Sequence, residues 1–556
     1  MSPAEPFRLT RWTGRRWLAV AATLAVMAAA GVVLGLMVGG AGASSRCTTD
    51  RAAPSGSRAS TRQQETVLDA AYARMVHGPA CLAGDRDVVD YGIGKLWSRG
   101  IDGAGTTIAL AEGWDDPSID KQVAHYDRLG SLPNPQITTI YPSGDHKLPA
   151  KCASSGFGDS CSGDKNELQL DVLSAHLMAP YAKIVIFVTP ADSEVREDAA
   201  SQGDPPEMMQ GVEAISRDHL ANVISISYGA GESTYRYGRN EVTAQDPGEL
   251  AAAAAGIPVA VATGDCGPVQ PVATATGPCT PHTTKPEIGT WDDSPWTLAV
   301  GGSTPSATGS RIVPGFFPEN AGFSSIFARP SYQNGVASVT HSRWRSVPDI
   351  TMDNSGGTSE SAPLMAGVLA LATQANGGHD LGPINPALYD VLGPKGAADG
   401  IVDITRGNDS LTSVNGKKVL ARGYTAHKGF DVASGWGTIY APRFVPAVVR
   451  ATRASHDERP VRAQAAAQLA VLRRAIDLSP ASVTGATTSH LTATGFLPLF
   501  PVVLSIDGRK VAALHADGHG DVSDTLVPSR LHLRHASNTV TLTSMLITVT
   551  GHLTVQ

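Results

Sequence analysis

The chain has 556 residues, of which 42% are hydrophobic and 17% charged, with 58 Gly and 37 Pro. This composition excludes wholesale disorder and a polytopic membrane protein, and it indicates a turn-rich globular chain with room for several domains. Lysine and arginine total 44 against 51 aspartates and glutamates, which gives a formal net charge of -7. Because no dense basic surface is predicted, we expect no nucleic-acid partner.

An uncharged apolar segment near the N-terminus predicts contact with a membrane. It runs over residues 17–40 and follows a basic segment, residues 1–16, that carries four arginines. Such a length is enough to span a bilayer with the arginines on the cytoplasmic side, which favours a transmembrane anchor. The small residues at 41–43 keep a cleaved signal open as the alternative. In both interpretations the rest of the chain lies outside the cytoplasm, held at the cell membrane or secreted.

The six cysteines agree with that compartment because all of them follow the apolar segment. They form three near-neighbour pairs: Cys47 and Cys81, Cys152 and Cys161, and Cys266 and Cys279. Disulfides that close local loops are expected, although six cysteines allow fifteen connectivities. No CxxC spacing indicates zinc.

Apolar runs alternate with amphipathic stretches, which is typical of an α/β protein. Predicted buried parallel strands lie at 106–111, 183–188, 222–227 and 257–262, and predicted helices include 166–178 and 207–220. We expect a short extracytoplasmic linker at 44–84, a large α/β domain at 85–450, a helical linker at 451–478 and a small β domain at 479–556.

The densest chemical signal is a Gly-rich turn that leads into an apolar helix, Ser355-Gly-Gly-Thr-Ser-Glu-Ser-Ala-Pro-Leu-Met-Ala-Gly367. It places Ser359 at a helix N-terminus, where backbone N–H groups and the helix dipole favour a developing oxyanion. The structural alternative is that Thr358 or Ser359 only caps the helix. Gly-Thr-Ser-x-x-x-Pro is also the nucleophile motif of subtilisin-like peptidases. The His-Gly-Thr motif of those enzymes is absent, so a histidine-based mechanism is the weaker alternative.

Three carboxylates are candidates for the missing base and its partners. In a helix, Glu167 and Asp171 are four residues apart and share one face. Two like charges resist ionising together, so one can hold a proton while the other accepts a proton from serine. Asp265 follows the strand predicted at 257–262, and active sites gather at strand ends in open α/β sheets. Solvated surface carboxylates and an ordinary turn aspartate are the structural alternatives.

These three motifs, in this order, resemble the sedolisin family of serine-carboxyl peptidases. Other family landmarks lie at 294–302, 322–325, 330–333 and 347–350, so the resemblance covers roughly residues 85–445.

That resemblance implies a subtilisin-like parallel sheet flanked by helices, and activity on peptides or proteins. It also implies Ser359 as nucleophile, Glu167 as general base, Asp171 as its support and Asp265 as oxyanion-hole donor. Asp265 must be protonated to donate a hydrogen bond, so activity at acidic pH is expected.

The resemblance also implies one Ca2+ ion near the end of the peptidase domain. The matching ligands are Asp403, Asp431 and the main-chain carbonyls of Ile404, His427 and Gly429, a set of oxygen donors that suits a hard cation. His427 stands where the family has glycine, which matters only if the backbone needs a positive φ. Two ordinary turn aspartates are the alternative.

Three features depart from the family or lie at the edge of the resemblance. Only about 40 residues separate the apolar segment from the peptidase region, so a full prodomain is missing. Tyr228 stands where tryptophan is common. Glu112, at the end of the first predicted strand, matches an acidic residue that can extend the catalytic hydrogen-bond network.

The C-terminal β domain resembles a bacterial immunoglobulin-like module, with Ala493-Thr-Gly-Phe496 followed by Val-rich strands. It could contact cell wall or protein, or act as a spacer. A catalytically idle surface-binding protein on a peptidase fold is therefore the rival function.

Overall fold

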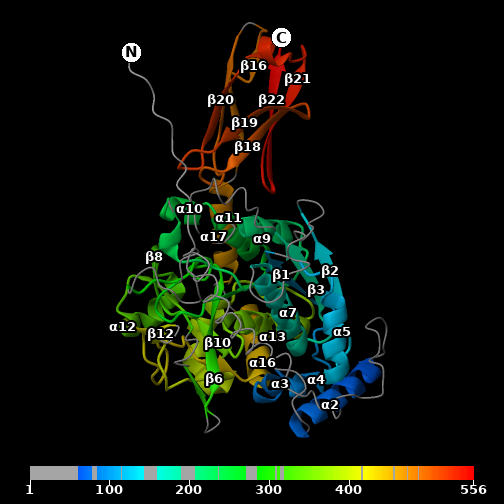
Figure 1. Ribbon diagram of the computed structural model, residues 1–556, viewed down its shortest axis with the longest axis vertical. Helices are drawn as coiled ribbons and strands as arrows, with labels where there is room; N and C mark the ends of the chain where they lie inside the picture. The colour runs from blue at the N-terminus through cyan, green and yellow to red at the C-terminus, as the bar shows by residue number, and fades with distance from the viewer. Residues whose placement is uncertain are drawn as a thin grey trace, which may run out of the picture.

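The computed structural model describes residues 61–77, 84–113, 115–142, 160–189, 207–235, 237–270, 285–306, 310–313, 319–414, 417–454, 458–472, 474–485 and 487–556 (Figure 1). The membrane segment predicted at 17–40 lies outside these residues, so anchor and cleaved signal both stay predictions. Within the described ranges, no helix combines the length and hydropathy that a membrane span requires.

A parallel sheet forms the centre of the large domain, in the order β10-β6-β5-β4-β1-β3-β2, and β7 pairs antiparallel with β6. Its strands are β1 Thr107–Glu112, β2 Gln136–Ile140, β3 Lys183–Val188, β4 Val223–Ile226, β5 Val259–Ala262, β6 Leu298–Pro305, β7 Arg311–Ile312 and β10 Ile350–Asp353. Four of them, β1, β3, β4 and β5, match the predicted strands to within two residues at each end.

Helices cover both faces of this sheet. On one face α7 (Ser160–Met178), α13 (Thr358–Ala375) and α16 (Ala441–Ala454) share a core with Ile108 and Leu110 of β1. On the other face α9 (Glu207–Arg217) and α11 (Asp246–Ala255) share a core with Ala109 and Ala111 of the same strand. Successive side chains of a strand point to opposite faces, so a strand buried on both faces must be apolar throughout. This requirement explains the continuous apolar runs in the sequence.

The interval predicted as a linker at 44–84 contains a helix that packs on the domain. Helix α2 spans Thr61–His77, and its residues Leu68, Ala71 and Met75 are fully buried in the same core as α7 and α13. Arg74 of this helix forms an ion pair with Asp85, with a distance of 2.8 Å from Nη1 to Oδ2. The apolar spacing of three and four residues is that of a helix face turned to a core, so the described part of this interval belongs to the large domain.

The predicted helical linker at 451–478 also differs from the structure. Helix α16 already begins at Ala441, and α17 (Glu458–Val471) packs on α11, where Arg462 Nη2 donates to the carbonyl of Ala255 at 2.9 Å. Strand β15 (Ile476–Ser479) begins before the predicted linker ends. The composition of the segment indicated helix correctly but did not mark where the helices end.

The C-terminal domain is mostly β, as predicted, and lies beyond α17 (Figure 1). Its two sheets have the orders β15-β17-β20 and β16-β22-β21-β18-β19. Both sheets contribute to one core, for example through Leu491 and Leu542. Besides β15, the elements are β16 Ser482–Val483, β17 Ser489–Ala493, β18 Pro501–Ile506, β19 Arg509–His515, β20 Val522–Leu526, α18 Pro528–Leu531, β21 Ser537–Ser544 and β22 Ile547–Val555.

The remaining elements are short connections around the sheet. The helices are α3 Asp85–Asp90, α4 Gly94–Trp97, α5 Ile119–Gly130, η1 Glu232–Thr234, α10 Arg239–Thr243, η2 Ser331–Val336, α12 Ala337–Thr340, α14 Ile384–Ala387, η3 Leu388–Leu392, α15 Gly393–Lys395 and η4 Gly396–Asp399. The strands are β8 Gly322–Ala328, β9 Trp344–Val347, β11 Ile401–Val402, β12 Leu411–Val414, β13 Lys417–Ala421 and β14 Thr438–Ile439.

Candidate active site

Ser359 is the second residue of the buried helix α13. Among residues 358–373, all of which are described, Ser359 is the one residue whose side chain is not buried. The residue that caps the helix is Gly357, which has no side chain to form a capping hydrogen bond. The capping interpretation of Thr358 and Ser359 is therefore not supported by the contacts. A partly buried hydroxyl at the start of a buried helix can still be reached by a substrate, and the helix terminus favours negative charge there.

Asp265 is bonded directly to the turn that carries Ser359. Its Oδ1 accepts hydrogen bonds from the Thr358 backbone N–H at 2.7 Å and from the Thr358 hydroxyl at 3.0 Å. The Thr358 hydroxyl oxygen in turn accepts the N–H of Gly264 at 2.8 Å. Burial raises the pKa of Asp265, and the bonds from Thr358 offset part of that effect. Because Oδ1 is the acceptor, a donated proton belongs on Oδ2.

Gly357 makes room for that carboxyl. Its φ is +86°, and a Cβ added there would lie 2.5 Å from Asp265 Oδ2. We therefore expect Gly357→Ala to strain the turn, displace Asp265 and lower kcat by roughly ten-fold or more, since a left-handed backbone costs a non-glycine residue about 1–2 kcal/mol before any clash. Steady-state hydrolysis of a peptide measures this effect.

The control for this substitution is Gly335→Ala, because Gly335 has no heavy atom within 4 Å of an added Cβ. That variant should turn over like the wild type. A Gly357→Ala enzyme with unchanged kcat would contradict the role given to the turn.

Cys266, the residue next to Asp265, is held by a covalent bond. Cys266 is buried and disulfide-bonded. The predicted partner, Cys279, lies outside the described residues, as do Cys47, Cys81 and Cys152, so the pairing of the cysteines stays a prediction.

The acid pair on α7 lies beside the nucleophile turn. Asp171 is fully buried, and Glu167 lies one helical turn earlier and is half-buried. The hydroxyl oxygen of Ser227, just beyond β4, is 2.7 Å from Asp171 Oδ2 and 3.2 Å from the backbone carbonyl of Ser359. Leu170 of the same helix contacts the turn at Gly356, where an added Cβ would lie 3.2 Å from Leu170 Cδ1. The structure thus brings the predicted base, its support and the predicted nucleophile to one place.

A third carboxyl, Glu112 at the end of β1, belongs to the same cluster. It is fully buried, and the Tyr228 hydroxyl donates to its Oε2 at 3.3 Å. Burial, then the proximity of Glu112 and Glu167, raises the pKa of Asp171 well above its ordinary value. Asp171 therefore retains a proton readily, and the role of Glu167 as the proton acceptor stays a prediction.

The predicted calcium ligands also lie together. Asp403 Oδ2 accepts the N–H of Gly429 at 3.0 Å, and Asp431 Oδ2 accepts the N–H of His427 at 2.7 Å. Burial raises the pKa of Asp431 to about 6. Gly429 has a φ of +80°, whereas His427 is not among the residues with positive φ, so histidine fits at its position without strain.

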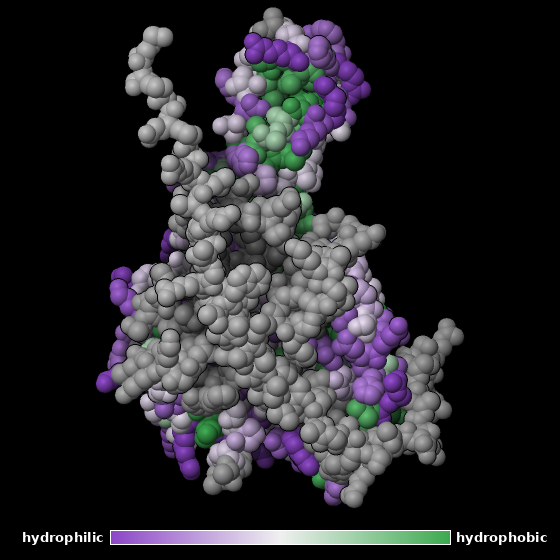
Figure 2. Space-filling model, in the orientation of Figure 1, coloured by the Kyte–Doolittle hydropathy of each residue, from purple (hydrophilic) through white to green (hydrophobic). Residues whose placement is uncertain are grey.

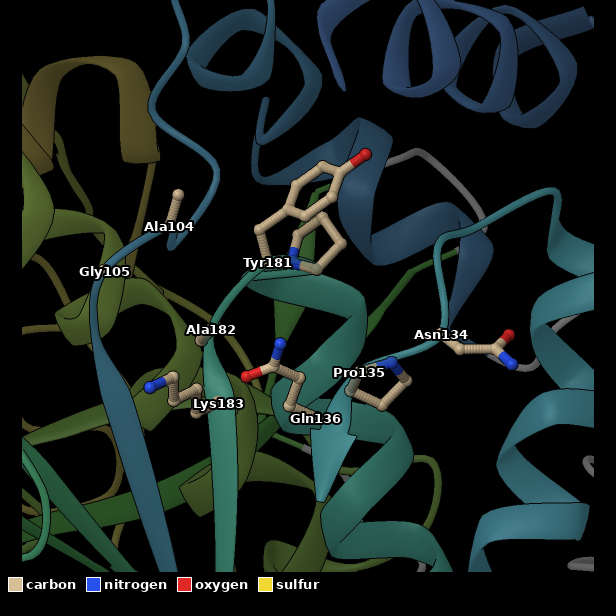
Figure 3. Close-up of a pocket in the computed structure, with 9 residues that line it drawn as sticks. Ala104, Gly105, Asn134, Pro135, Gln136, Tyr181, Ala182 and Lys183 are labelled. Atoms are coloured by element: carbon tan, nitrogen blue, oxygen red, sulfur yellow. The ribbon is translucent and has the colours of Figure 1, made fainter. Parts of the chain in front are cut away.

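The pocket in the close-up of Figure 3 is separate from these groups. It has a volume of 190 Å³ and is lined by residues at the amino ends of β1, β2 and β3, among them Gly105, Gln136 and Lys183. Ser359, Asp265 and Glu112 lie at the opposite end of the strands, where active sites of parallel sheets form. The pocket therefore has no part in the candidate site.

The sequence analysis missed two residues that position the site. Ser227 joins the acid helix to the nucleophile turn, and Thr358 joins Asp265 to it. Both lie inside motifs that were recognised, at a strand end and immediately before the serine. Their position next to chemically active residues was the available signal.

A serine at the start of a central buried helix, beside a parallel sheet and buried carboxyl groups, is an arrangement typical of the subtilisin-like α/β class of serine peptidases. The model of the subtilase family matches residues 176–386, which include Asp265 and Ser359 but begin after Glu167 and Asp171.

The chain is also similar to individual proteins and, in fold, to a solved structure. Kumamolisin from Bacillus sp. (strain MN-32) is 27% identical over 385 residues, which are 63% of this chain and 61% of kumamolisin. Human tripeptidyl-peptidase 1 is 30% identical over 190 residues, 28% of this chain and 31% of that protein. The fold resembles Pseudomonas sedolisin, a serine-carboxyl proteinase complexed with two molecules of pseudo-iodotyrostatin, with a TM-score of 0.50 and 20% identity over 62% of this chain and 93% of that one. These similarities support a relation of the chain to the sedolisin family.

Proposed function

We propose that this chain hydrolyses peptide bonds in peptides or proteins at acidic pH, outside the cytoplasm. One observation carries the proposal: the carboxyl of Asp265 is bonded to the turn of Ser359, and Ser227 joins the same turn to Asp171. Similarity to kumamolisin and tripeptidyl-peptidase 1 supports the reaction class, although the chain spans only 61% of the length of kumamolisin.

The reaction follows from these positions. Ser359 Oγ attacks the scissile carbonyl carbon while Glu167 accepts the hydroxyl proton, and Asp171 supports Glu167 through the shared cluster. The carbonyl oxygen becomes an oxyanion, to which Asp265 donates a hydrogen bond. The C–N bond then breaks as Glu167 gives the proton to the leaving amine. Water then attacks the acyl-enzyme while Glu167 accepts its proton, and Ser359 takes up that proton as the free carboxylic acid leaves.

The protonation states that the proposed reaction requires of Asp265 and Glu167 restrict it to acidic pH. An ionised Asp265 would repel the oxyanion, so its raised pKa is what keeps it a donor over the working pH range. Glu167 must at the same time be ionised to act as a base.

A direct test incubates the purified chain with a diverse peptide mixture from pH 3 to 7 and identifies products by mass spectrometry. Cleavage that is strongest in acid and absent from Ser359→Ala supports the proposal. No cleavage at any pH by folded protein would refute it and favour the idle surface-binding protein instead. The cleavage sites also separate endopeptidase from tripeptidyl-peptidase action.

We also propose a calcium ion between Asp403 and Asp431. The bond from Gly429 to Asp403 joins the segments at 403–404 and 427–431, and Asp431 accepts the N–H of His427 within the second segment. The carbonyls of Ile404, His427 and Gly429 would complete a set of oxygen donors that suits Ca2+. The ion would tie the two loops at the end of the domain.

Removing calcium should lower the melting temperature, because a ligand that binds only the folded state stabilises it by mass action. A chelator is expected to lower the Tm of the wild type but not that of the double variant Asp403→Ala, Asp431→Ala. Metal analysis should find calcium only in the wild type. Exposed Asp477 provides a control, since Asp477→Ala should keep both the metal and the chelator effect. Equal Tm for wild type and double variant, with no bound calcium in either, would refute the site.

We propose that the N-terminal segment places the enzyme at the membrane and that the C-terminal domain is an immunoglobulin-like module that contacts cell wall or protein. A hydrophobic area bordered by hydrophilic residues on that domain supports a contact surface (Figure 2). Co-sedimentation of the full chain with cell-wall fragments tests the contact. Recovery of the chain only in the supernatant would contradict it.

A further inference from the structure

Asn320 lies behind the loop that carries Asp265. It is fully buried, two residues before β8. Its backbone N–H donates to the carbonyl of Gly264 at 2.7 Å. Its side-chain amide nitrogen lies 2.5 Å from the carbonyl of Gly267 and 3.0 Å from that of Glu287. One residue therefore holds the loop on both sides of Asp265 and fastens it to the chain near Glu287.

We propose that Asn320 is a positioning residue for Asp265, an inference that rests on the proposed function. Gly264 and Gly267 both have positive φ, +99° and +63°. Glycine restricts the backbone less than any other residue, so these two positions do not by themselves hold the loop in one conformation. Their carbonyls need buried donors, and Asn320 supplies them. An oxyanion donor acts only if it lies within a few tenths of an ångström of its productive position. The hydrogen bonds with Thr358 hold the Asp265 carboxyl from one side only.

Burial of this loop also bears on the charge of Asp265, because burial is the main cause that raises the pKa of that carboxyl. A loop loosened by loss of Asn320 would admit water to Asp265. Its pKa would then fall toward the ordinary value, and the alkaline limb of activity would move to lower pH.

The first test compares Asn320→Ala with Asn385→Ala. Asn385 is also a buried asparagine whose amide donates to a backbone carbonyl, that of Thr297 at 2.7 Å. Both variants should lower Tm. Only Asn320→Ala should lower kcat, by about 10- to 100-fold with KM nearly unchanged, which is the scale of misplacing a catalytic group by about 1 Å. Its alkaline limb should move to lower pH.

The second test is a double-mutant cycle with Asp265→Asn. If Asn320 acts through Asp265, Asn320→Ala should lower kcat far less in the Asp265→Asn background than in the wild type. Asn320→Ser keeps a short hydrogen-bond donor, so its kcat should lie between those of the wild type and Asn320→Ala. If Asn320→Ala does not fold, Asn320→Ser replaces it in the double-mutant cycle.

The outcomes separate the two proposals. Additive effects in the cycle, or a kcat of folded Asn320→Ala and Asn320→Ser equal to the wild type, would overturn the role of Asn320. Failure of the proposed function is a different result, namely wild-type turnover that does not depend on Ser359.

Discussion

Replacing Ser359 by alanine is expected to lower kcat at least ~100-fold, because the variant cannot form the acyl-enzyme. KM should change little, since the side chain is small and the helix is otherwise intact. Hydrolysis of a peptide at its acid optimum measures the loss. The control is Ser361→Ala, two residues along α13, whose hydroxyl donates to the backbone carbonyl of Asp353 at 2.7 Å and should affect stability more than turnover. Normal hydrolysis by Ser359→Ala would exclude it as nucleophile.

The same loss is expected when the proton acceptor is removed. Glu167→Ala should lower kcat at least ~100-fold, as should Asp171→Ala and Asp265→Ala, on the scale of losing a general base or one oxyanion donor. Each protein must first be shown to be folded, because Asp171 is fully buried. Near-normal turnover by Glu167→Ala would refute the assignment of base and support.

The pH profile of kcat/KM should be a bell with its maximum below pH 6. On the acid side, activity rises as the cluster of Glu112, Glu167 and Asp171 loses a proton, so the limb reports the cluster and not one residue. On the alkaline side, activity is present while Asp265 is protonated and is lost as pH rises through its raised pKa. A maximum at pH 8 or above, as a neutral histidine base would give, counts against this mechanism.

Asp265→Asn isolates the alkaline limb. Asparagine donates a hydrogen bond at any pH, so the variant should retain part of its activity and extend it to higher pH, whereas Asp265→Ala should lose the donor throughout. The acid limb should stay where it is in the wild type. An alkaline limb that does not move in Asp265→Asn would show that another group sets it.

The predicted strands coincide with the sheet because burial on both faces demands uninterrupted apolar runs, and such runs stand out in a sequence. The helix at Thr61–His77 was missed for the opposite reason. Among residues 67–77, whose side chains are described, Leu68, Ala71 and Met75 are buried in the core and Tyr72 packs against it, with the charged residues Asp69 and Arg74 between them. From the sequence alone, such a pattern does not show whether the helix packs on the domain, because this depends on the surface that its apolar face contacts.

Motif order alone selected Glu167, Asp171, Asp265 and Ser359, because the chemistry needs those residue types next to particular backbone turns. Their roles stay predictions, but the structure places Asp265 against the Ser359 turn and joins that turn to Asp171 through Ser227. What the sequence by itself determined was therefore the class of fold and a set of candidate reactive groups. Only the tertiary structure decided how they are held, through Thr358, Ser227 and Asn320, because hydrogen bonds between residues about 50 to 130 positions apart depend on packing and leave no local pattern.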